Sequence, residues 1–278
     1  MDPFSGVKLK LLNEKASADY AVESKTELKD AGIGKVHTLV PNKTYKQTEY
    51  DLFDALPNLP QGHPLHMEIA HLKALRVRPN ARGDRTIHLH FLEAFPNLAQ
   101  LVVCNGVIGQ TGQLTDSGLE ALALVRCEGQ LNLPSSALNT VALLDCDAIA
   151  LGQGLGHVPN WHIAAGPNRP GLPTGLAALN GIECLTIQCE WFFSADISEV
   201  LEITSLKTLR LVGGGAQPLD LSQLKTLPNL QELEMIRHDY DPQTLASLGH
   251  LEAIYFGRGK KGDLPQSIKS IARKARPK

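Results

Sequence analysis

The sequence predicts an α/β solenoid, in which short similar units stack side by side and their strands form one parallel β-sheet. Two compositional observations and one periodic observation predict it. Leucine supplies 44 of the 278 residues, whereas all aromatic residues together make up 5%. Of those leucines, 38 fall within residues 51–257. Within that segment an apolar pattern recurs nine times, about every 22 residues. A fixed period of this length is typical of a stacked array and not of a globular core.

The recurring pattern is an apolar residue, two residues, a second apolar residue, one residue and a third apolar residue. Its copies are Leu72-Leu75-Val77, Leu98-Leu101-Val103, Leu119-Leu122-Leu124, Leu138-Val141-Leu143, Val158-Trp161-Ile163, Ile182-Leu185-Ile187, Leu206-Leu209-Leu211, Leu230-Leu233-Met235 and Leu251-Ile254-Phe256. Their spacing resembles the LxxLxL consensus of the leucine-rich-repeat superfamily, as an irregular, bacterial-like array. The resemblance implies a horseshoe with a parallel concave β-sheet of about nine repeats over residues 51–257.

The segments between the predicted strands indicate a mixed convex side. Residues 114–122, 219–227 and 241–248 each place a Ser, Thr or Asp before a short apolar helical pattern, which predicts short helices. Residues 131–138 contain a proline and are too short for a helix, so we expect an extended segment there. The tripeptide Pro-Asn-Leu occurs three times and predicts a turn into the next strand.

The two ends of the chain differ from the array. Residues 1–50 contain two apolar alternations, at residues 7–11 and 36–40, and predict an N-terminal cap over the first repeat. Residues 258–278 carry eight Lys or Arg and one acid, which gives this segment +7 and leaves −9 on residues 1–257. Helical spacing of Ile268, Ile271, Ala272 and Ala275 predicts a basic C-terminal capping helix. The alternatives are a tail that binds an anionic partner or a nucleic-acid backbone, or self-association with the acidic body.

Strand parity assigns the concave face. If Leu75 and Val77 point into the core, then Arg76 and Arg78 point to the concave surface. Across the nine repeats the central outward row is Arg76, Val102, Ala123, Ala142, His162, Thr186, Arg210, Glu234 and Tyr255. The row that follows it is Arg78, Cys104, Val125, Leu144, Ala164, Gln188, Val212, Ile236 and Gly257.

The middle of this face is apolar and its ends carry charge. A contiguous apolar surface with a charged rim is typical of a protein-binding site. The alternatives are that a loop or the N-terminal segment covers the apolar centre, or that its small residues only allow the strands to curve. The segment 190–193 adds three adjacent aromatic residues, either at the surface or packed under the next segment. The predicted partner-binding residues are Arg76, Arg78, Val102, Val125, Leu144, His162, Gln188, Trp191, Arg210, Glu234 and Tyr255.

Residues that could carry chemistry do not assemble into a catalytic pattern. His88 and His90 alternate as two metal ligands on one strand could, but no acidic or cysteine ligand stands beside them at a regular spacing. Cys127 and Cys146 occupy successive positions three residues after the repeat pattern, where we expect buried structural thiols and not nucleophiles. The sequence therefore predicts no catalytic residues, no metal site and no cofactor.

The resulting hypothesis is a non-enzymatic scaffold that recognises a partner protein through its concave face. A bacterial immunity protein that neutralises a toxin is its specific form. The alternative is a nucleic-acid-binding protein that uses the basic tail with Arg76, Arg78 and Arg210. The sequence has no apolar stretch of membrane-spanning length, no signal-peptide run and an odd set of five cysteines without a CxxC pair, so we expect a cytoplasmic protein.

Overall fold

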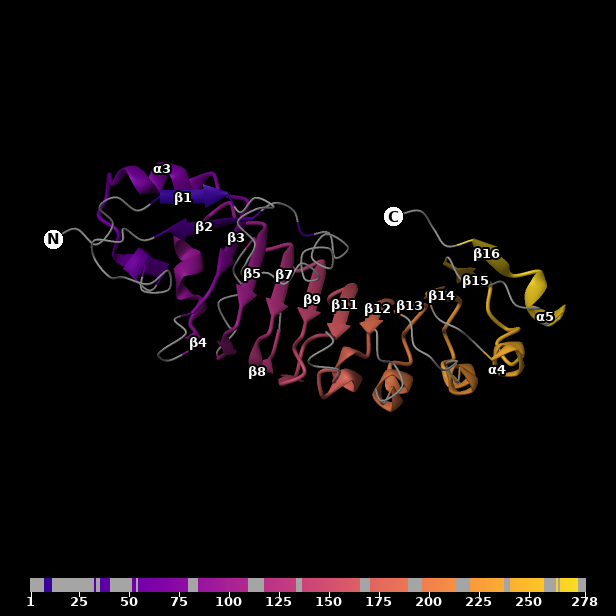
Figure 1. Cartoon of the computed structure of the whole chain (residues 1–278). Coiled ribbons are helices and arrows are strands. Elements are labelled where there is room, and N and C mark those ends of the chain that lie inside the picture. Colours follow the sequence, from indigo (N-terminus) through magenta and orange to yellow (C-terminus); the bar gives the residue numbers. More distant parts are fainter. Residues whose placement is uncertain are drawn as a thin grey trace.

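The chain folds into the predicted solenoid, in which stacked repeats place their strands side by side in one long sheet (Figure 1). The computed structural model describes residues 8–11, 33, 36–40, 52–53, 55–79, 85–109, 118–133, 137–165, 171–189, 197–213, 221–237, 241–257, 264 and 266–274. In these residues a 12-stranded sheet runs the length of the molecule, and its strand order follows the order of the chain. Apart from an antiparallel first pair, its paired strands are parallel.

Each predicted copy of the repeat pattern supplies one strand of this sheet. The strands are β3 (Ala74–Val77), β5 (Gln100–Cys104), β7 (Ala121–Val125), β9 (Thr140–Leu144), β11 (Asn160–Ala165), β12 (Cys184–Cys189), β13 (Thr208–Val212), β14 (Glu232–Ile236) and β15 (Ala253–Phe256). In the observed register Leu75 lies opposite Leu101, which lies opposite Leu122, and the same position continues to Ile254. The predicted period and register are both confirmed.

The core follows from this register. The second and third apolar positions of the repeats point to one side of the sheet and join a single continuous cluster, in which Trp161 is among the largest fully buried side chains. Burying each such side chain contributes about 1.5–3 kcal/mol, and the contribution depends on the neighbouring repeat that covers it. The array is therefore stable only as a stack.

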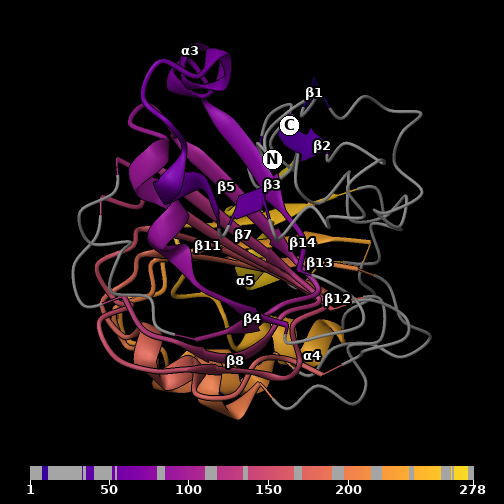
Figure 2. The ribbon, with the colours of Figure 1, turned by 90° about the vertical axis from the view of Figure 1, so that its left-hand side faces the viewer.

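The outer side of the array changes along its length. Beneath the first repeats lies a second parallel sheet of β4 (Thr86–Ile87), β6 (Val107–Ile108), β8 (Glu128–Leu131) and β10 (Ile149–Leu151) (Figure 2). Further along, the 3₁₀-helices η6 (Leu176–Leu179), η7 (Ser198–Glu202) and η8 (Ser222–Thr226) and the α-helix α4 (Pro242–Ala246) take this place.

Three of the predictions for the outer side are tested by these elements. Helical structure over 219–227 and 241–248 is confirmed, and Asp241 caps α4 by accepting a hydrogen bond from the Gln243 amide at 2.9 Å. The helix predicted over 114–122 is wrong at its described end, because residues 118–120 are not helical and β7 already begins at Ala121. The neighbouring strands offer backbone partners there, which an isolated helical turn cannot match.

The Pro-Asn-Leu asparagines do more than turn the chain. The Asn97 side-chain amide donates to the Ala70 carbonyl at 2.7 Å, and Asn229 donates to the Thr204 carbonyl at 2.7 Å. In both cases the bond reaches back to the preceding repeat. Each of these asparagines therefore satisfies a carbonyl of the preceding repeat and links two neighbouring repeats.

At the N-terminus, β1 (Lys8–Leu11) pairs antiparallel with β2 (His37–Val40), and β2 pairs in parallel with β3 through His37 opposite Leu75. The two predicted apolar alternations thus give the strands that begin the sheet. The chain then forms η3 (Leu56–Asn58) and α3 (Pro64–Ala70), whose first turn is capped by His63. Directly after β4, η4 (Leu89–Ala94) contacts η3.

The C-terminal segment departs from the prediction of one helix. A short helix α5 (Gln266–Lys269) is followed by a strand, β16 (Ala272–Lys274), that pairs with β15. Ile268 is fully buried in the core, so the apolar positions do close the last repeat, but the backbone of residues 272–274 is extended. The open edge of β15 provides hydrogen-bond partners for a strand, which explains why the helix stops early. Within the described residues, no helix is long and apolar enough to cross a bilayer.

Candidate functional site

The concave face consists of the outward rows that parity predicted. In the central row Arg76 lies opposite Val102, and the register continues through Ala123, Ala142, His162, Thr186, Arg210 and Glu234 to Tyr255. The following row, from Cys104 to Ile236, is paired in the same way. The assignment of these side chains to one face is therefore confirmed.

The apolar centre of this face is covered. Val102 and Leu144 are 0% exposed and Val125 is 4% exposed, so the contiguous apolar surface considered from the sequence is not open to solvent. These side chains belong to a hydrophobic cluster separate from the main core. We call its sheet residues the apolar concave patch: Ala74, Val102, Cys104, Ala121, Ala123, Val125, Ala142, Leu144 and Ala164.

Two residues of the N-terminal segment complete this cluster. Ile33 and Val36, which precede β2, are 4% and 6% exposed and pack with the apolar concave patch. Of the interpretations left open by the sequence, the structure favours coverage by the N-terminal segment. The sequence signal missed was the pair of branched apolar residues Ile33 and Val36, which lie just before and at the start of the second alternation.

The residues that flank the patch are also withdrawn from solvent. Arg76 and His162 are buried at its two ends, and Arg78 is half-buried just beyond β3. Trp191, which was predicted to contact a partner, lies outside the described residues. The predicted partner-binding residues are thus divided: the N-terminal members are covered, Glu234 is also buried, and Gln188, Arg210 and Tyr255 are partly exposed.

The C-terminal part of the face is polar. We call it the polar concave surface and define it as Thr186, Gln188, Arg210, Glu232, Glu234, Tyr255 and Arg273. Arg210 forms an ion pair with Glu234 on the next strand, with Nε 3.0 Å from Oε2, and the two side chains are 21% and 11% exposed. The Tyr255 hydroxyl donates to Glu232 Oε1 at 3.5 Å. These contacts link three adjacent strands into one fixed surface.

Arg273 is a member of this surface that the sequence did not reveal. It lies opposite Tyr255 in the β15–β16 register, and its side chain is exposed. Its guanidinium donates to the carbonyls of Ser270 and Ala272 at 2.8 and 3.0 Å, which holds it at the end of the row. It was missed because a helix over this segment would have given it no fixed relation to the sheet.

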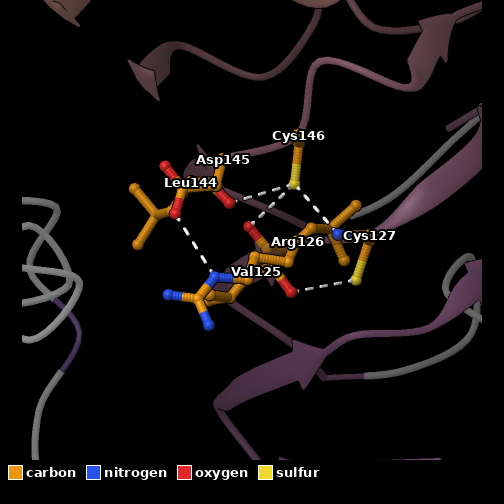
Figure 3. A network of polar contacts seen from close by, with 7 residues as sticks. Val125, Arg126, Cys127, Leu144, Asp145 and Cys146 are labelled. Atoms are coloured by element: carbon orange, nitrogen blue, oxygen red, sulfur yellow. Dashed lines mark hydrogen bonds and ion pairs between the residues drawn. The ribbon is translucent and has the colours of Figure 1, made fainter. Parts of the chain in front are cut away.

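The two cysteines predicted to be structural thiols, Cys127 and Cys146, lie at successive turns of the solenoid (Figure 3). The Cys127 amide donates to Cys146 Sγ at 3.4 Å, and Cys146 Sγ lies 3.3 Å from the carbonyl oxygens of both Leu124 and Leu144. A hydrogen bond with the Cys146 thiol lowers the pKa of Cys127, whereas burial raises the pKa of Cys146. Both thiols are buried, and their contacts are those of structural residues.

In these turns the residue that directly follows the strand adopts the left-handed conformation. Asn105, Arg126 and Asp145 have φ values of 58°, 53° and 55°. The Arg126 amide donates to the Leu144 carbonyl at 2.8 Å, and its side chain pairs with Asp145, Nε to Oδ2, at 3.4 Å. This turn ends β5, β7 and β9, and after β7 and β9 it places a cysteine in the core.

His88 and His90 do not share a strand face as expected. His88 precedes η4 and His90 lies within it, and their ring centroids are 6.3 Å apart. In the part of the chain that the structure describes, no group of three or more His, Cys, Asp or Glu could hold a metal ion.

Comparisons with known proteins add little to this geometry. No protein-family model matches the sequence, and no curated protein matches it. Among solved structures, an internalin from Listeria monocytogenes is similar over 75% of this chain and 69% of its own, with 16% sequence identity and a TM-score of 0.38. The fold assignment rests on the repeat period, the strand order and the register of this chain.

Proposed function

We propose that this chain is a non-enzymatic scaffold that binds a partner protein through the polar concave surface. Stacked-repeat folds present an extended concave surface whose outward side chains are free to vary while the core is kept. The observation that carries the proposal is the row Arg210, Glu234, Tyr255 and Arg273, which four adjacent strands hold in register.

The composition of this row supports a protein partner. Tyr and Arg are enriched in interface hot spots, because each combines a large contact area with a polar group. Positive and negative side chains alternate along the row, which favours a partner with complementary charges of both signs. The intramolecular Arg210–Glu234 pair fixes both side chains before binding, which lowers the ordering cost of association.

The nucleic-acid alternative has less support. Two of the arginines on which it depends are engaged elsewhere, since Arg76 is buried and Arg210 pairs with Glu234. A phosphate backbone along this row would also meet Glu232 and Glu234. Such a backbone requires a cluster of one sign, whereas this row is mixed.

The specific form of the proposal is a bacterial immunity protein that binds and neutralises a toxin in the cytoplasm. All five cysteines are free thiols, as is usual in a reducing compartment. A test is co-expression with the product of the neighbouring gene. If that product inhibits growth and this chain relieves the inhibition, the result supports the immunity role. If this chain does not relieve the inhibition, the immunity role is contradicted, but the general proposal of a protein-binding scaffold is not.

The surface itself is tested with a pair of matched substitutions. Arg273→Glu reverses a charge on the polar concave surface, and Lys225→Glu makes the same change on the exposed outer side, in η8. Once a partner is identified by crosslinking to the wild-type chain, Arg273→Glu should weaken its Kd about tenfold. Lys225→Glu should leave it within about twofold. Equal effects of the two substitutions, or binding that nuclease treatment abolishes, contradict the proposal.

A further inference from the structure

The apolar concave patch is an interaction surface that the chain itself occupies. Its nine residues and the two N-terminal residues Ile33 and Val36 form a cluster distinct from the main core, on the opposite face of the sheet. An apolar surface spanning five parallel strands is typical of a binding site when it is open. Here a segment far away in the sequence shields it.

The chemistry of the contact is simple. The patch contains small side chains, among them Ala123, Ala142 and Ala164. Ile33 and Val36, three residues apart, pack larger, branched apolar side chains against it. Any segment that takes their place must present apolar side chains of similar size, because a polar group would be buried there without a partner.

Among the strand pairs of the long sheet that the structure describes, the one that joins this segment to the array is the shortest. Between β2 and β3 the described register is a single pair, His37 opposite Leu75. By contrast, four residue pairs join β3 to β5 and six join β11 to β12. Segments with few ordered contacts are the ones that open locally without unfolding the rest of a protein.

We propose that the segment around Ile33 and Val36 is an internal ligand of the apolar concave patch and detaches as a unit. The surface that it uncovers binds an extended partner segment bearing branched apolar side chains. The existence of such a partner rests on the proposed function, whereas detachment is a property of this chain alone. The two ideas can therefore fail separately.

The chain contains its own reporters of detachment. Cys104 belongs to the apolar concave patch and is 3% exposed, so it reacts with a thiol reagent only when the patch opens. Cys127 and Cys146 lie in the main core and report global unfolding. Cys184, at the start of β12, is partly exposed and reports the activity of the reagent. Peptide-level mass spectrometry resolves the labelling rate of each.

In the wild-type chain Cys104 should label more slowly than Cys184 and about tenfold faster than the two core cysteines. Ile33→Asp with Val36→Asp should raise the Cys104 rate about tenfold further and leave the core rates unchanged. Met67→Asp places the same group at a 69% exposed apolar residue of α3 and should change no rate. A synthetic peptide of residues 29–40, added to the double variant, should restore protection of Cys104, and the same peptide with both apolar residues replaced by Asp should not.

Labelling of Cys104 only together with Cys127 and Cys146, in wild type and variant alike, would overturn the proposal, because the segment would then be an integral part of the fold. If the double variant loses its cooperative thermal transition, it no longer folds and cannot test the proposal. The Cys104 labelling rates of the wild-type chain and of the milder variant Ile33→Ala then test it instead. Failure of the peptide to protect Cys104 in a folded variant would overturn the binding half. None of these results depends on Arg273, so they leave the test of the polar concave surface untouched.

Discussion

The two halves of the array have the same strand geometry and present opposite surfaces. From β3 to β11 the outward rows are apolar and covered by the N-terminal segment, and a second sheet lies on the outer side. From β12 to β16 the outward rows are polar and partly open, and 3₁₀- and α-helices form the outer side. The repeat period fixes which side chains face outward, but the composition of those rows decides whether the face is a core or a surface.

This difference has an energetic consequence. Strands of the first half are buried on both faces, like those of parallel sheets enclosed between layers. Strands of the second half bury one face only, so each depends more on the main core. We expect the second half to respond most strongly to core substitutions and the first half to respond to concave ones.

The largest effect is expected from Leu209→Asp in β13. Leu209 is 1% exposed and packs between the core positions of β12 and β14, so the variant buries an unpaired carboxylate. The expected loss exceeds about 4 kcal/mol and unfolds at least the C-terminal repeats, as followed by circular dichroism and hydrogen exchange. Lys225→Asp on the exposed side of η8 is the control, and an unchanged cooperative transition for Leu209→Asp would show that the core register is wrong.

A second, smaller effect compares the halves directly at one register position. Leu144 in β9 and Ile236 in β14 occupy the same outward row, but Leu144 is fully buried and Ile236 is partly exposed. Leu144→Arg should cost about 3 kcal/mol, and Ile236→Arg should stay within about 1 kcal/mol. Denaturant midpoints measure both. Equal costs would mean that the two halves of the concave face are equally covered.

The smallest effect concerns the buried turn cysteines Cys127 and Cys146, which in the described turns occur only in the first half. Burial raises the pKa of Cys146, so above the ordinary thiol pKa of about 8.5 the unfolded chain releases a proton that the folded chain keeps. Stability from this group is complete below that pH and falls as the pH rises through the raised folded value. Unfolding between pH 8 and 10 should therefore show a slope of up to about 1.4 kcal/mol per pH unit that Cys146→Ala reduces. Identical slopes in both proteins would contradict it.

The sequence was sufficient for the array because its signal is local and repeated. Leu75, Leu101 and the equivalent residues are each specified by neighbours two and three positions away, so period and parity together fix strand, register and face. The turn cysteines and the Asp241 cap were predictable for the same reason, since each depends on residues of one or two adjacent repeats.

What the sequence could not supply depends on contacts between distant segments. Parity gives the direction of Val125 and Leu144, but not that they share a buried cluster with Ile33 and Val36, about a hundred residues earlier. Likewise, the spacing of Ile268 and Ile271 fits a helix, yet the open edge of β15 draws residues 272–274 into a strand. Arg273 joins the polar concave surface only through that pairing.

The order of the long sheet also bears on how copies of this chain behave in a crowded solution. Among the described strands the terminal ones are β1 and β16, and the sequence of each contains two cations, Lys8 and Lys10 in one and Arg273 and Lys274 in the other. A parallel stack with open ends would otherwise template the addition of a further copy. Because both ends bring positive charge, end-to-end contacts repel, and we expect the array to resist growth into filaments.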